Sequence, residues 1–262
     1  MGHVLLGNLP KSRRWNEVVR RLLNKEDADA VAAASQEAAD TAFGAMHNDP
    51  GFQDVVEILT QLGVAAEKPD PAAHLATYGL KLPDNPSLVS VSLALNGALN
   101  AATARREHLS DLAIIGGRSL VAAVTQHLNA ALGTLITPTT RDVVSELGKL
   151  GRETQFGKLA QTFFYNVAKD CQRHFLSKEL GAHVGAGRAF PTTGQLSNFE
   201  AALDTHAREA SVIVEVFAKD WFSKRMHLDN KSISKMRSSG FGWKAMKKIR
   251  AEMKKRATDE GS

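Results

Sequence analysis

Apolar side chains recur every three or four residues along much of the chain, which is the spacing of one face of an α-helix. In the segment 52–62 this repeat consists of Phe52, Val55, Leu59 and Leu62. A longer stripe in 197–226 consists of Phe199, Leu203, His206, Ala210, Ile213, Phe217 and Trp221. The alternating pattern of a half-buried strand is scarce. The sequence therefore predicts an all-α protein.

Capping residues indicate where several of these helices begin. Asp49-Pro50, Asp70-Pro71 and Asn85-Pro86 each place a side-chain acceptor before a proline, which suits the first helical position. Ser197 followed by Glu200 fits a capping box. We predict a multi-helix bundle of about ten helices, at 11–24, 26–47, 50–62, 71–78, 86–106, 110–135, 139–150, 152–180, 197–226 and 241–257.

One irregular stretch divides the chain. Gly185, Gly187, Pro191 and Gly194 lie close together and are typical of a linker. We predict a helical bundle body over 1–182, a Gly-rich linker over 183–196, a long helix packing on the body plus a connector over 197–239, and a basic C-terminal helix and tail over 240–262.

Two uncharged stretches, 85–104 and 119–140, are long enough to cross a bilayer, for which about 20 residues suffice. The first contains several serines and asparagines, and the second has Gln126, His127 and Asn129 near its middle. Polar side chains at the centre of a span are costly. We expect buried core helices here, with a membrane-active hairpin as the alternative.

Charge is distributed unevenly along the chain. The net charge is +5, from 33 Lys and Arg against 28 Asp and Glu. Residues 1–218 carry 20 basic and 23 acidic residues, whereas 219–262 carry 13 basic and 5 acidic ones. A slightly acidic body with a strongly basic end indicates a polyanionic partner.

The basic segment also has an apolar stripe, formed by Trp243, Met246, Ile249 and Met253. A helix there would dock by this stripe and present a ridge of positive charge to a phosphate backbone. A docked helix with solvated lysines and a helix on an anionic membrane are the alternatives. The predicted nucleic-acid-binding residues are Lys224, Arg225, Lys231, Lys235, Arg237, Lys244, Lys247, Lys248, Arg250, Lys254, Lys255 and Arg256.

Catalytic and metal-binding patterns are weak. The nearest approach to a phosphate-binding loop, from Gly151 to Leu159, has five residues between its glycines and lacks the hydroxyl residue. Cys171, the single cysteine, cannot form an internal disulfide or a structural zinc site. It continues an apolar stripe and is expected to be a small buried hydrophobe, with a Cys171–His174 pair as the catalytic alternative. We predict no metal, no cofactor and no catalytic residue.

Together these features favour a non-enzymatic helical subunit of a larger assembly. We expect it to bind the DNA or RNA backbone non-specifically through its basic C-terminal face, and to have a protein partner. A nuclease or other enzyme with a site assembled from several helices is one alternative, and a membrane-active effector is another. The N-terminus lacks the apolar run of a secretory signal, so we expect a cytoplasmic protein. An accessory protein of a bacterial multigene system such as phage defence fits this description.

Overall fold

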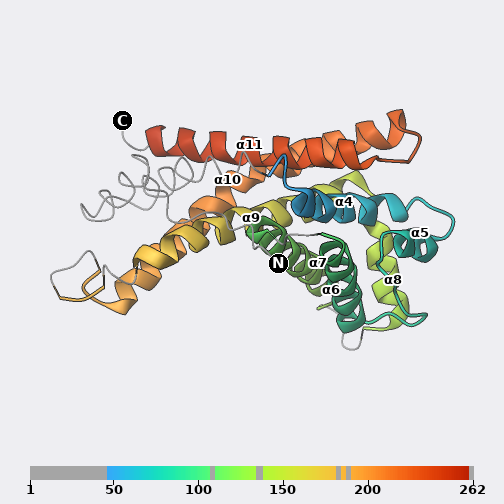
Figure 1. Ribbon diagram of the computed structural model, residues 1–262, viewed down its shortest axis with the longest axis horizontal. Helices are drawn as coiled ribbons and strands as arrows, with labels where there is room; N and C mark the ends of the chain where they lie inside the picture. The colour runs from blue at the N-terminus through green and yellow to red at the C-terminus, as the bar shows by residue number, and fades with distance from the viewer. Residues whose placement is uncertain (1–45, 107–109, 134–137, 181–183, 187–189, 260–262) are drawn as a thin grey trace.

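The computed structural model describes residues 46–106, 110–133, 138–180, 184–186 and 190–259, and within these ranges it contains eight α-helices and no strand. The all-α prediction is confirmed (Figure 1). The predicted helices 11–24 and 26–47 lie outside the described residues, apart from Met46 and His47, which form part of a turn. The eight helices are α4 (Pro50–Ala65), α5 (Pro71–Thr77), α6 (Leu88–Ala104), α7 (Asp111–Leu132), α8 (Thr140–Lys149), α9 (Glu153–Leu180), α10 (Thr193–Leu228) and α11 (Lys235–Asp259).

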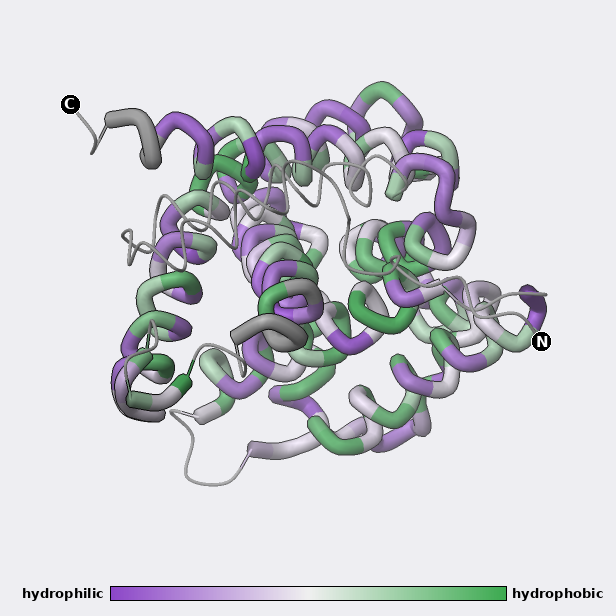
Figure 2. The backbone as a smooth tube through the Cα atoms, turned by 60° about the vertical axis from the view of Figure 1, so that its left-hand side comes forward, coloured by the Kyte–Doolittle hydropathy of each residue, from purple (hydrophilic) through white to green (hydrophobic). Residues whose placement is uncertain are grey.

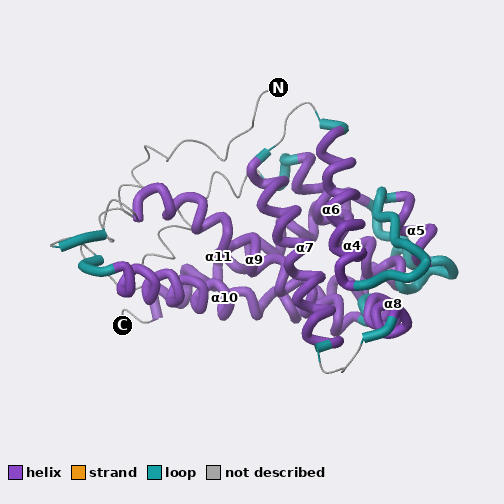
Figure 3. Tube along the Cα trace, turned by 90° about the horizontal axis from the view of Figure 1, so that it is seen from below, coloured by secondary structure: helices purple, strands orange, loops and turns teal. Residues whose placement is uncertain are grey.

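α9 and α10 are the two longest helices and form an antiparallel pair (Figures 1 and 3). Arg173 Nη2 lies 2.8 Å from Asp204 Oδ2 towards one end of the pair, and Lys219 Nζ lies 3.9 Å from Glu153 Oε1 at the other. Gly157 allows the close approach, because a Cβ there would lie 2.8 Å from the carbonyl oxygen of Glu215. On its other side α9 packs against α7, which in turn contacts α4 and α6.

α11 packs against α4 and α10. A tight turn at Asn230 and Lys231, both with positive φ, leads from α10 into α11. Buried polar contacts fix α11 on α4: the Thr60 and Ser238 hydroxyl oxygens are 2.6 Å apart, and the Gln61 side-chain amide donates to the Ile233 carbonyl at 2.8 Å. Buried hydrogen bonds of this kind set the register between two helices because an unpaired partner would be costly.

Two of the predicted helix starts are confirmed. Asp49 Oδ1 accepts from Phe52 N at 2.7 Å, and Asp70 Oδ1 accepts from Ala73 N at 2.9 Å. In both helices proline occupies the first turn, where its missing N–H leaves no donor unsatisfied.

The other two predicted starts are wrong. α6 is capped by Ser87, which forms a reciprocal capping box with Ser90, so Asn85 lies outside the helix. α10 begins at Thr193, inside the segment predicted as a linker, because Thr192 and Gln195 form a capping box. In α6 a reciprocal pair forms the cap in place of Asn85, and in α10 the earlier of two possible capping boxes does, so that Ser197 lies within the helix.

α11 begins six residues before the predicted start at 241 and continues through Gly240 and Gly242. The predicted stripe is correct for Met246, Ile249 and Met253, which are buried. It is wrong for Trp243, which is 37% exposed. The buried stripe continues instead through Gly242, where a Cβ would lie 3.0 Å from Val56 Cγ2, so close packing on α4 outweighs the low helix propensity of glycine.

Every described helix contributes buried apolar side chains to one hydrophobic core, and the outer faces of the helices lie outside it. Figure 2 shows hydrophilic residues dominating α11, interrupted by the apolar positions that pack inwards. α6 is buried on one side only, because Val89 and Leu93 are exposed. None of the described helices has the combination of length and hydropathy needed to span a membrane.

Candidate functional site

A groove of about 630 Å³ lies between α10 and α11. We call it the basic groove. Five of its lining residues are cations, and each is among the predicted nucleic-acid-binding residues: Lys224, Arg225, Arg237, Lys244 and Lys248. Asp220 is the one carboxylate among the lining residues. The groove therefore brings together side chains from two helices with a strong excess of positive charge.

Three of the five cations have neither an ion pair nor a ring contact among the described residues. Lys224, Arg237 and Lys244 are exposed and make no ion pair with any residue that the structure describes. The other two are partly used: Arg225 Nη1 lies 3.6 Å from Asp229 Oδ1, and Lys248 Nζ lies 5.3 Å from the centre of the Phe217 ring. The groove cations with neither an ion pair nor a ring contact among the described residues are thus one lysine of α10 and two cations of α11, and Lys248 adds a charge that no carboxylate pairs with there.

The floor of the basic groove is aromatic. Phe241 of α11 is buried, with its ring centre 4.3 Å from that of Trp221 and 5.6 Å from that of Phe217. Both pairs are nearly parallel, at 21° and 22°. Because Trp221 and Phe217 are only partly buried, they present ring surface to the groove. The rings of Phe156 and Phe164 also pack against the Phe241 ring and hold it in place.

Two apolar side chains at the edge of the basic groove are exposed to solvent. Val216 of α10 is 62% exposed, and Met236 of α11 is 75% exposed. Single exposed apolar residues are normal on a protein surface. Here they line the same groove as Phe217 and Trp221, so the groove combines apolar side chains with cations.

Two predicted binding residues lie outside the basic groove and are paired with carboxylates. Lys231 Nζ lies 2.9 Å from Glu67 Oε2. Lys235 forms an ion pair with Asp54, and its Nζ lies 3.7 Å from Glu57 Oε2. The Lys235 pairs attach the start of α11 to α4, and the Lys231 pair joins the turn before α11 to the residues that follow α4, so both lysines have a structural partner.

The remaining predicted residues lie along α11 beyond the groove lining. Lys247 Nζ lies 5.1 Å from the centre of the Trp243 ring. Arg250, Lys254 and Lys255 each have an interaction partner. The side chain of Arg256 lies outside the described part of the structure. Of the twelve predicted residues, five line the basic groove, six others lie outside the groove lining, and the side chain of Arg256 is not described.

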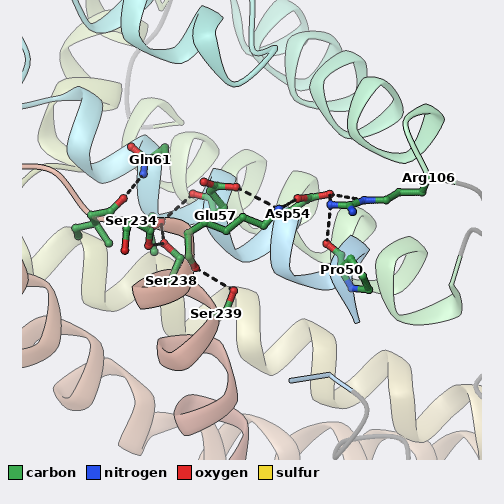
Figure 4. Close-up of polar contacts among 11 residues, drawn as sticks. Pro50, Asp54, Glu57, Gln61, Arg106, Ser234, Ser238 and Ser239 are labelled. Carbon is green, nitrogen blue, oxygen red and sulfur yellow. Dashed lines mark hydrogen bonds and ion pairs between the residues drawn. The ribbon is translucent and has the colours of Figure 1, made fainter. Parts of the chain in front are cut away.

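A second, smaller cavity of about 340 Å³ lies where α4 and the end of α6 meet the start of α11. Asp54 Oδ2 accepts two hydrogen bonds from the Arg106 guanidinium, at 2.5 Å and 3.1 Å (Figure 4). Burial raises the pKa of Glu57, and the neighbouring Lys235 partly opposes that rise. Both carboxylates are therefore engaged by cations of the chain, which makes this cluster a clamp between helices. Sequence spacing gave no signal for it, because its members are distant along the chain.

Cys171 and His174 were the catalytic alternative. Cys171 is buried, and burial raises the pKa of its thiol far above the usual range. The thiolate needed for nucleophilic attack is disfavoured there. His174 Nε2 lies 3.9 Å from Asp111 Oδ2. The geometry gives Cys171 the role of a small core residue.

Within the described residues no group of three or more His, Cys, Asp or Glu side chains is arranged to hold a metal ion. The basic groove is larger than the cavity at Asp54 and Glu57, and of these two it is the one with an excess of cations that have no carboxylate partner among the described residues. Its aromatic floor was missed as a site feature, since Phe217 and Trp221 belong to the apolar stripe of α10 and were assigned to the core. The chain matches no protein-family model, no curated protein and no solved structure.

Proposed function

We propose that the protein binds nucleic acid through the basic groove, with Lys224, Arg237 and Lys244 contacting phosphates. One observation carries this proposal: three exposed cations that have no partner among the described residues come from two helices and line one groove, whose lining includes a single carboxylate. Like charges held close together repel each other, and a polyanion that lies along them relieves this repulsion and releases its own counterions.

The cation types favour contact with the backbone over reading of the bases. Lysine is a point-like charge that suits a single phosphate, whereas bidentate recognition of a guanine edge is chiefly the work of arginine. Of the two arginines in the basic groove, Arg225 already pairs with Asp229. We therefore infer binding that is largely independent of sequence. The lining offers positive charge, aromatic surface and one carboxylate, which is a set suited to binding, and we infer no reaction for it.

The test is a titration of fluorescently labelled nucleic acid by anisotropy at several salt concentrations. The variant K224Q/R237Q/K244Q removes the three unpaired cations. We expect its affinity at about 0.1 M salt to fall by about a hundredfold, and the slope of log K against log salt to flatten by about 2 to 3, because each lost phosphate contact contributes 0.7 to 0.9.

The matched control is K81Q/R118Q/R141Q, which removes three exposed cations from outside the basic groove and changes the net charge equally. We expect this control to bind with nearly the affinity and salt slope of the unchanged protein. Equal losses in the two triple variants would show that net charge and not the groove governs binding, and would contradict the proposal.

A further inference from the structure

The cations of the basic groove explain attraction to any phosphate backbone. They do not explain why aromatic side chains line the floor of the groove. A duplex keeps its bases stacked inside and offers mainly phosphates and sugars to a surface of this kind. The apolar floor would then stay in contact with water. A single strand differs, because its bases have free faces that stack on aromatic side chains.

The ring geometry of the floor suits stacking. Trp221 and Phe217 lie one turn apart on α10, and each ring is nearly parallel to that of Phe241. Lys248 Nζ lies over the Phe217 ring, 5.3 Å from its centre, so a base at Phe217 would also contact this lysine. Phe241 is itself held by other buried rings, so the exposed ring surfaces are fixed before any ligand arrives. A rigid platform loses little conformational freedom on binding, which strengthens binding.

Gly240 opens the α11 wall of the groove. A Cβ built on Gly240 would meet no atom within 4 Å, so no protein packing requires glycine there. Glycine within a helix is unfavourable compared with alanine. A small residue at this place lets a flat base or sugar approach the helix backbone closely.

The dimensions of the groove also separate the two forms of nucleic acid. A volume of about 630 Å³ is in the range of pockets that enclose a small ligand. It admits parts of one strand, whereas a duplex would have to lie across the rim. Lys224 on one wall and Arg237 and Lys244 on the other can then hold the phosphates that flank the inserted bases.

We propose that the basic groove binds single-stranded nucleic acid in preference to duplex, with unpaired bases placed against Phe217 and Trp221 and beside Gly240. This inference rests on the proposed function and adds the class of ligand. The walls supply charge for the backbone, and the floor supplies apolar surface for the bases.

The experiment compares a labelled mixed-sequence strand of about 20 nucleotides with the same strand annealed to its complement. The unchanged protein should bind the single strand at least tenfold more tightly. The variant Gly240→Leu fills the open space in the groove and keeps every cation. We expect it to bind the single strand about tenfold more weakly and the duplex with unchanged affinity.

Gly97→Leu is the matched control, since Gly97 is also a helical glycine with no atom near its Cβ position and lies in α6, outside the groove. It should bind both ligands as the unchanged protein does. Phe217→Leu keeps apolar volume and removes a ring, and it should weaken single-strand binding alone. Circular dichroism of each variant establishes that it is folded.

The outcomes separate the two proposals. Duplex binding as tight as single-strand binding, with both lost in K224Q/R237Q/K244Q, would overturn the single-strand preference and leave the proposed function standing. No binding of either ligand at low salt would overturn both. Binding to phosphatidylserine vesicles in place of nucleic acid would assign the groove to an anionic lipid surface and would likewise overturn both.

Discussion

The two sides of α11 use similar residues in opposite ways. The docking face packs on the body, and its one lysine, Lys235, is paired with Asp54 and Glu57 of α4. Its other members are the buried residues Ser238, Gly242, Ala245, Ile249 and Met253. The groove face, which consists of Arg237, Gly240, Lys244 and Lys248, lines the basic groove. Here Arg237 and Lys244 have no carboxylate partner among the described residues.

The difference arises from helix geometry. Lys235 and Arg237 are two residues apart, which turns their side chains about 200° from each other around the helix. One therefore reaches the carboxylates of α4 and the other reaches the groove. Basic residues that are neighbours in sequence thus do not all lie on the same surface of the protein. Only those without a carboxylate partner in the folded protein are available to a ligand.

The largest expected effect comes from Phe241, because both faces depend on it. Phe241→Ala should lower the free energy of unfolding by about 3–5 kcal/mol, the usual cost of removing a buried aromatic side chain. It should also weaken ligand binding, since the ring supports Trp221 and Phe217. Urea denaturation measures the first effect. Met236→Ala, at a site that is 75% exposed, should change stability by less than about 0.5 kcal/mol.

The same substitution at two nearby glycines should have opposite effects. Gly242→Ala places a methyl group 3.0 Å from Val56 Cγ2, and Val56 is buried and stiff at χ1, so we expect a loss of about 1–3 kcal/mol. Gly240→Ala enters open space and should gain about 0.5–1 kcal/mol from helix propensity. Thermal unfolding of the two variants measures both effects. A loss of stability in both would show that neither glycine position tolerates a side chain.

Removing one lysine from each face should separate stability from binding. Lys235→Gln leaves Glu57 without its cation and should cost about 1 kcal/mol, with an unchanged salt slope for ligand binding. Lys244→Gln should change stability by less than about 0.5 kcal/mol and flatten the salt slope by about 0.7 to 0.9. Finding the slope altered in Lys235→Gln would place ligand on the docking face.

The smallest expected effect is a pH dependence of the docking face. Burial raises the pKa of Glu57 above its usual value, so the folded protein binds a proton at Glu57 more tightly than the unfolded chain does. The contribution of protonated Glu57 to stability therefore falls as pH rises from the pKa of the unfolded chain to that of the folded protein. Lys235 lowers the same pKa, so Lys235→Gln should raise it further. The stability deficit of Lys235→Gln should therefore be small at pH 4 and grow towards pH 7, whereas that of Lys244→Gln should stay constant.

Sequence periodicity was sufficient to predict the all-α class and where the helices lie. Each helix predicted within the described residues is present, because local amphipathic pattern and tertiary burial agree along this chain. The errors lie at ends, where several acceptors compete, and at Gly240 and Gly242, which suggest a turn in isolation. Packing of Gly242 on Val56 keeps the helix continuous.

The site could be predicted only in part. Composition located the basic residues, yet the partners that neutralise Lys231 and Lys235 lie 164 and 181 residues away along the chain. A local sequence pattern cannot predict a contact between residues that far apart along the chain. The protein partner, the larger assembly, the cytoplasmic location and the bacterial phage-defence setting stay predictions, and so does the enzyme alternative.

The length of α10 has a mechanical consequence. Its 36 residues form one helix, at about 1.5 Å each roughly 54 Å long, and it has no proline and no glycine after Gly194 at which kinks arise. It is paired with α9 through Asp204 towards one end and through Lys219 towards the other, close to Lys224 of the groove. α10 therefore connects the groove to the Asp204 ion pair as one rigid element without a hinge. A ligand that tilts α10 at the groove would have to move the helix along its whole length, together with its contacts to α9.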